Sequence, residues 1–233
     1  MCHLIRENQR ESLFEYYDHQ TSIILRSQLS NCITQNLQKT MLQPSPSNTI
    51  YINFIAEIND KTSSLLLYLL TEQLRAGIKS FRINISSGGG LVNNSISIFN
   101  LLNGLRDVTL HTHNLGQIDS AANLIFLAGQ KRTASKASTF LLHPPQMNFQ
   151  GQGPVGLSIE TLRERLDSLE KDQHKMAEVI SRKINKSTEE VVRMFNDRKT
   201  YSSTDAKDMG FIHEIDDFVA TPGLPIFSIT NQS

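Results

Sequence analysis

The chain has 233 residues, enough for one sizeable α/β core with tails. Lys plus Arg and Asp plus Glu both total 23, so no overall field would draw the protein to nucleic acid or to an anionic membrane. Its cysteines, Cys2 and Cys32, have no metal-ligand spacing, which argues against a zinc site or a disulfide framework. The longest apolar run, residues 65–70, cannot span a bilayer, and the N-terminus lacks the apolar core of a signal peptide. We expect a cytoplasmic protein that holds no metal or cofactor.

A stretch rich in proline and serine at residues 41–48 cannot continue a helix or a central strand, and it marks a boundary. Before it, residues 21–37 could form an amphipathic helix, and we take residues 1–48 as an N-terminal extension that is partly helical or disordered. Residues 49–216 are expected to form the main domain. Residues 217–233 form a C-terminal tail, either loosely attached or docked in extended form.

The first half of the main domain alternates between strand and helix patterns. Residues 49–58 have apolar residues at every second position, which predicts a strand, and a helix is expected over residues 61–77, after Asp60 and ending at Gly77. The same patterns predict further strands at 80–86 and 107–115 and helices at 93–105 and 121–129. This order is typical of βαβ units, so we predict an α/β fold with a parallel sheet.

The second half of the domain is dominated by one long helix, expected over residues 156–184 after a strand at 138–143. The helix has an apolar stripe that needs a partner, either its own core or another subunit. Its members are Ile159, Leu162, Leu166, Leu169, Met176 and Ile180. A helix starting with a capping box at Ser187 and Glu190 follows, and then a short helix that closes at Gly210.

Three junctions between strands and helices could carry chemistry, since such loops are exposed in doubly wound sheets. The glycine turn "SSGGG" at residues 86–90 could hold an oxyanion or simply form a tight turn. Ser120 could be a nucleophile at a helix N-terminus or an ordinary N-cap. His143 ends a strand and could be a base for the serine or a structural histidine.

Five segments, taken together, resemble the proteolytic subunit of the Clp protease family in order and spacing. They are "INDKTSSLL", "ISSGGGLV", "GQIDSAANLIFLAG", "KRTASKASTFLLHPP" and "SSTDAKDMGFIHEID". The resemblance covers about residues 49–216. It implies the Clp protease/crotonase-like fold of repeated ββα/βαβ units, with a long protruding handle helix, here 159–184.

The resemblance also implies site residues. Ser120 would be the nucleophile and His143 the general base, and the amides of Gly90 and Ala121 would form the oxyanion hole. In the family the acid lies four residues before the serine that Ser202 matches. Arg198 occupies this position here, so Asp197, one residue earlier in the chain, is the candidate acid that orients the histidine. The substrate-binding residues implied are Gly89, Phe149, Gln150 and Gly151.

The resulting hypothesis is a serine endopeptidase subunit that cleaves unfolded polypeptides by a Ser-His-Asp mechanism. The family implies homo-oligomeric heptameric rings that stack through the handle helix, and a ring ATPase unfoldase that feeds them in ATP-dependent proteolysis. A catalytically impaired or inactive ring or scaffold subunit is the alternative, because the acid is displaced and Asp119 stands where the family has a small residue. A crotonase-type acyl-CoA enzyme is a third interpretation.

Overall fold

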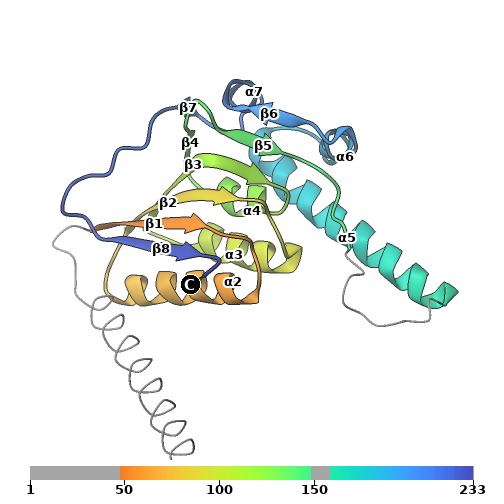
Figure 1. The fold of residues 1–233 in the computed structure, drawn as a ribbon, viewed down its shortest axis with the longest axis horizontal. Helices are drawn as coiled ribbons and strands as arrows, with labels where there is room; N and C mark the ends of the chain where they lie inside the picture. Colours follow the sequence, from red (N-terminus) through yellow and green to blue (C-terminus); the bar gives the residue numbers. More distant parts are fainter. Residues whose placement is uncertain (1–47, 148–157, 233) are drawn as a thin grey trace, which may run out of the picture. The chain divides into compact units, whose positions relative to one another are not determined.

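A computed structural model describes residues 48–147 and 158–232, and at its centre is an eight-stranded sheet (Figure 1). The strands are β1 (Thr49–Ile55), β2 (Ser80–Ser87), β3 (Thr109–Asp119), β4 (Lys131–Ala134), β5 (Thr139–Leu141), β6 (Thr200–Ser202), β7 (Glu214–Ile215) and β8 (Ile226–Thr230). The helices are α2 (Asp60–Arg75), α3 (Val92–Gly104), α4 (Ala122–Leu127), α5 (Ile159–Ile184), α6 (Thr188–Asp197) and α7 (Ser203–Asp208). The helix expected over 21–37 and the substrate-binding residues expected at 149–151 lie outside the described residues.

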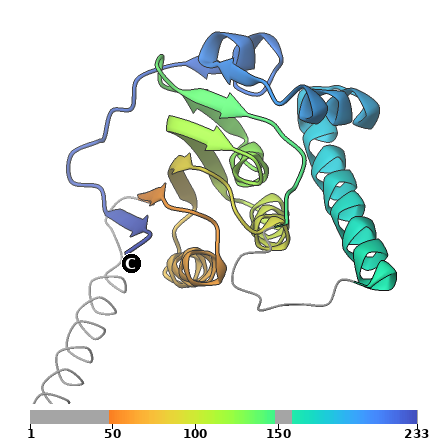
Figure 2. The same cartoon turned by 45° about the vertical axis from the view of Figure 1, so that its right-hand side comes forward.

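The sheet has the strand order β6-β5-β3-β2-β1-β8, with β4 paired to β3 and β7 paired to β4. Its pairs are parallel except for β5 with β6. Parallel neighbours need crossover connections, which α2 provides between β1 and β2 and α3 between β2 and β3. The predicted α/β class with a parallel sheet is therefore confirmed. Figure 2 shows α2, α3 and α4 on one face of this sheet.

The helix boundaries follow from residues that satisfy the free backbone groups. Helix α2 begins after Asn59, which forms a reciprocal capping box with Thr62, and the chain leaves the helix through Gly77 at a φ of 86°. Helix α6 begins with the capping box of Ser187 and Glu190, as the sequence predicted. Gly210, also at positive φ, follows α7.

The C-terminal tail docks on the sheet in extended form. Strand β8 pairs in parallel with β1 and adds an edge strand that the sequence did not predict. The segment before β8 crosses the face of the sheet opposite α2, α3 and α4 (Figure 2). There it covers Tyr51, whose hydroxyl hydrogen-bonds Thr221 Oγ1 at 3.1 Å and whose ring meets Phe218 edge-on. This contact explains why Tyr51 is fully buried. Its side chain lies on the face of β1 opposite the one that carries the alternating apolar residues.

Helix α5 has a buried end and an exposed end. Met176 and Ile180, near its C-terminus, are fully buried, whereas Leu162 and Leu166 are 48% and 57% exposed. Among the described residues, the stripe predicted from the sequence is therefore buried along the second half of the helix and exposed along the first. No helix in the described ranges 48–147 and 158–232 is both long enough and apolar enough to cross a membrane.

Candidate active site

Ser120 lies in the turn between strand β3 and helix α4. Its φ of 54° is in the left-handed region, which non-glycine residues seldom adopt. Among the described residues, Asp107, Asn185 and Arg198 also have positive φ, but the last two are ordinary helix C-caps. Strained residues of this kind cluster at active sites, and a serine on a sharp strand-to-helix turn is the arrangement of the nucleophile elbow.

The hydroxyl of Ser120 does not cap the helix. The N-cap of α4 is Ala121, and no side chain caps this helix. The residue is only 8% exposed, and within residues 48–147 and 158–232 its hydroxyl makes no hydrogen bond. The N-cap alternative is therefore excluded.

Asn123 fastens this turn to the neighbouring strand. Its Nδ2 group donates to the carbonyl of Ser120 at 2.9 Å and to the carbonyl of Leu141 at 3.1 Å. The backbone N–H of Ser120 donates to the same Leu141 oxygen at 2.9 Å. The side chain of Asn123 is fully buried, and its Oδ1 has no partner among the described residues. Sequence reasoning missed this residue, because the sequence shows it only as an asparagine within an otherwise apolar helix.

The glycine turn after β2 packs directly against the serine turn. Gly89 has a φ of 91°, and a Cβ atom there would lie 2.8 Å from Ser120 Cβ and 3.3 Å from the nitrogen of Ala121. Gly90 forms a parallel bridge with Ile58 in which the carbonyl of Gly89 and the N–H of Leu91 make the hydrogen bonds. The N–H of Gly90 is thus left outside this bridge. The structure brings Gly89, Ser120 and Ala121 together.

His143 follows strand β5 and is half-buried. Its Nδ1 lies 2.7 Å from the carbonyl oxygen of Pro144. Burial raises the pKa of Asp119, while the charge on His143 acts in the opposite direction, which indicates that these two side chains are neighbours. No hydrogen bond between Ser120 and His143 is formed in the part of the chain that the structure describes. Catalytic hydrogen bonds are often long before substrate binds, so this geometry does not argue against the pair.

Asp197 is the C-terminal residue of α6, and its side chain is exposed. It borders an open surface concavity whose other lining residues come from the α5–α6 turn and from α6, namely Lys186, Glu190, Arg193, Met194 and Asn196. The hydrogen bond of His143 goes to a backbone carbonyl and not to this carboxylate. The structure does not join Asp197 to His143, and its role as the acid stays a prediction.

With this geometry in view, the chain can be compared with known proteins. A model of the family described as Clp protease matches residues 34–217, which is most of the chain. The chain belongs to the Clp protease family. The resemblance drawn from the motifs is thereby confirmed, and the family match favours the Clp interpretation over the crotonase alternative.

A solved structure shares the Clp protease fold. It is that of a point mutant of ClpP1 from Listeria monocytogenes, which is 19% identical in sequence and superposes with a TM-score of 0.62. The match covers 78% of this chain and 96% of that chain. At this identity the similarity establishes the fold, which confirms the predicted fold class, and it does not by itself assign any residue.

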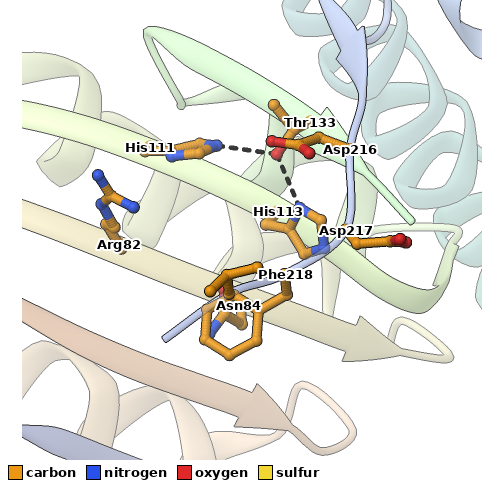
Figure 3. A pocket seen from close by; sticks show the side chains of 9 residues that line it. Arg82, Asn84, His111, His113, Thr133, Asp216, Asp217 and Phe218 are labelled. Carbon is orange, nitrogen blue, oxygen red and sulfur yellow. Dashed lines mark hydrogen bonds between the residues drawn. The ribbon is translucent and has the colours of Figure 1, made fainter. Parts of the chain in front are cut away.

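This Clp protease family member also has a pocket of about 160 Å³ that sequence reasoning missed (Figure 3). Thr133 Oγ1 joins His111 Nε2 at 2.8 Å and His113 Nδ1 at 2.7 Å. Burial, assisted by Arg82, lowers the pKa of His111 to about 4, and burial also lowers the pKa of His113. Both rings are therefore neutral at pH 7. The remaining lining residues are Asn84, Asp216, Asp217, Phe218 and Val219.

The pocket contains none of the residues proposed for catalysis. A sequence pattern could have predicted this pocket. Polar residues stand at alternate positions of "FRIN" and "LHTH", and they give one face of β2 and β3 a polar surface. Among the described residues, no group of three or more His, Cys, Asp or Glu side chains could hold a metal ion.

Proposed function

We propose that this protein is a serine peptidase subunit of the Clp type. Ser120 attacks the carbonyl carbon of a peptide bond, and His143 accepts the proton of its hydroxyl. The N–H groups of Gly90 and Ala121 hold the oxyanion of the tetrahedral intermediate. The observation that carries this proposal is the strained backbone of Ser120, which presents a hydroxyl without a structural role beside Gly89.

The remaining steps follow from the same groups. His143 returns the proton to the nitrogen of the leaving peptide, the C–N bond breaks, and an ester with Ser120 remains. A water molecule then attacks this ester, again with His143 as the base, and releases the carboxylate product. The helix α4 begins directly after the serine, so the positive end of its dipole favours each oxyanion.

The proposed substrates are unfolded polypeptides, and the proposed assembly is a homo-oligomeric chamber of heptameric rings in the cytoplasm. Family membership supports this view, as does the exposed apolar surface of α5, which includes Ile159, Leu162 and Leu166. A surface of this kind is typical of an interaction site. A ring ATPase that unfolds substrates is the expected partner.

A catalytically impaired ring subunit is the second candidate. It is favoured by the exposed position of Asp197, by the His143 ring, which has no carboxylate hydrogen bond among the described residues, and by the charge of Asp119 beside the nucleophile. Such a subunit would keep the fold and the assembly surface but would not cleave peptides.

Labelling with a fluorophosphonate separates these candidates, because the reagent reacts with activated serines. We expect an adduct on Ser120 that peptide mass mapping locates, and none in the Ser120→Ala variant. The variant should unfold within about 0.5 kcal/mol of the unmodified protein, since the hydroxyl makes no hydrogen bond in the described chain. Absence of the adduct in the unmodified protein between pH 6 and 9 would instead support the impaired subunit.

A further inference from the structure

We propose that the backbone carbonyl of Pro144 orients the imidazole of His143, and that the carboxylate of Asp119 supplies the negative charge near it. This inference rests on the proposed function, in which His143 is the base. In a Ser-His-Asp triad one carboxylate both fixes the tautomer of the histidine and stabilises the imidazolium. Here two groups divide these roles, and Asp197 is not required for either.

The hydrogen bond of His143 determines its tautomer. The Nδ1 atom lies 2.7 Å from the carbonyl oxygen of Pro144, and a carbonyl oxygen can only accept a hydrogen bond. The proton of the neutral ring is therefore on Nδ1, and Nε2 keeps its lone pair. Nε2 is the nitrogen that accepts the proton of the serine in the triad enzymes, so the carbonyl selects the tautomer that catalysis needs.

The sequence "HPP" holds this carbonyl in place. The ring of Pro144 fixes the φ of this residue near −65°. Because Pro145 follows, the ψ of Pro144 is restricted to the extended region. His143 precedes a proline as well, so its own backbone is restricted in the same way. The acceptor and the ring therefore lose little conformational entropy when the hydrogen bond forms.

The pairing of β5 with β6 ends before it reaches His143 or Asp197. Strand β5 pairs antiparallel with β6, and Leu141 lies opposite Thr200. Beyond this pair neither segment is part of a strand, because His143 follows the end of β5 and Arg198 is the left-handed C-cap of α6. Burial raises the pKa of Tyr201, and the charge of Asp197, exposed at the end of α6, adds to this effect.

Asp119 is positioned by the neighbouring strand on the other side. It lies opposite Leu141 in the parallel pair of β3 and β5. His143 is two residues beyond Leu141, just after the end of β5, which brings it near the end of β3 that carries Asp119. Burial raises the pKa of Asp119 and the charge of His143 opposes this effect, so the carboxylate lies where it would stabilise a positive charge that forms on the ring during catalysis.

The test compares three variants of the full chain by the rate of fluorophosphonate labelling as a function of pH. Asp208→Asn, a change at an exposed residue at the end of α7, is the matched control. We expect Asp197→Asn to lower the rate by less than about fivefold, as for other surface charges. We expect Asp119→Asn to lower it by about tenfold or more and to change the shape of the pH profile, because the negative charge that stabilises the developing imidazolium is lost.

A loss of about 10³ to 10⁴-fold in Asp197→Asn, with Asp119→Asn equal to the control, would overturn the proposal, since that is the cost of removing a triad acid. The tautomer is measured separately by nitrogen-15 NMR of the histidine rings, with His143→Gln used for assignment. A proton on Nδ1 of His143 is expected, and a proton on Nε2 would overturn the role of Pro144. This readout is independent of activity, so it tests the proposal even if the unmodified protein is not labelled.

Discussion

Replacing Gly89 by alanine should damage the active site far more than the same change at other glycines with similar backbone angles. Gly89 has a φ of 91°, and a Cβ atom would lie 2.7 Å from the carbonyl oxygen of Asp119 and 2.8 Å from Ser120 Cβ. Both distances are shorter than real Cβ contacts, and the backbone oxygen cannot rotate away. The serine turn would have to move.

The expected loss of unfolding free energy in Gly89→Ala has two parts. A left-handed conformation costs an L-residue about 1–2 kcal/mol, which the restricted unfolded state of alanine reduces by roughly 0.5 kcal/mol. Overpacking against fixed atoms adds about 1–3 kcal/mol. We therefore expect Gly89→Ala to lower the free energy of unfolding by about 3 kcal/mol in total.

Two matched controls separate these parts. Gly223 has a φ of 84°, and a Cβ atom added there would have no neighbour within 4 Å, so Gly223→Ala reports the backbone term alone, about 1 kcal/mol. Gly88 has no positive φ, and its nearest neighbour would be the flexible Gln117 side chain at 3.7 Å, so Gly88→Ala should be nearly neutral.

The assay is urea unfolding followed by far-UV circular dichroism, because the chain contains no tryptophan. Fluorophosphonate labelling of each variant in the absence of urea gives the second readout. We expect Gly89→Ala alone to lose labelling while it is still folded. A Gly89→Ala protein that matches Gly223→Ala in stability and labels at the normal rate would refute the packing of the glycine turn against the nucleophile.

Two further outcomes are expected. Replacing Leu166 and Leu169 by lysine should change the unfolding free energy of the isolated subunit by less than about 1 kcal/mol, because Leu166 is 57% exposed and Leu169 half-buried, but should yield smaller particles and lower activity. Sedimentation that shows a monomer for the unmodified protein at micromolar concentration, with equal activity in the variant, would contradict the ring model. The second outcome concerns His111, whose pKa falls from 6.5 to about 4 on folding. Below pH 6.5 the unfolded chain binds a proton that the folded chain does not, so stability should decline as the pH falls towards 4. Relative to His111→Gln, the unmodified protein should lose about 1 kcal/mol between pH 7 and pH 5, after allowance for the exposed part of the ring. If the unfolding free energies of the two proteins, measured by urea unfolding, change equally with pH, then burial of His111 in the pocket does not affect stability and the prediction is wrong.

The amino-acid sequence determined the order of the main elements and the place of the serine. Apolar residues at every second position predicted β1, and Asp60 and Gly77 bounded the predicted α2, although the structure shows that Asn59 caps this helix. The long helix and its stripe were also evident from the sequence. These features depend on residues close together in the chain, whose spacing directly reflects the period of a strand or a helix. For the same reason Ser120 could be located between a strand and a helix.

The short strands could not be predicted in this way. Strands β4, β6 and β7 have only four, three and two residues, too few to show a period. Strand β8 lies in a tail with two prolines and forms because the edge of β1 offers unpaired backbone groups. The tail and β1 are far apart in sequence, so no local pattern links them.

The arrangement of the site was decided by the tertiary structure alone. The sequence suggested that Ser120 could be an N-cap, and only the fold showed its left-handed backbone and the packing of Gly89 against it. The sequence offered Asp197 as the acid, but the fold leaves this residue exposed at the end of α6 and gives His143 a hydrogen bond to the carbonyl of Pro144. The candidate residues can therefore be read from motifs, whereas their contacts follow from long-range pairing that no short segment encodes.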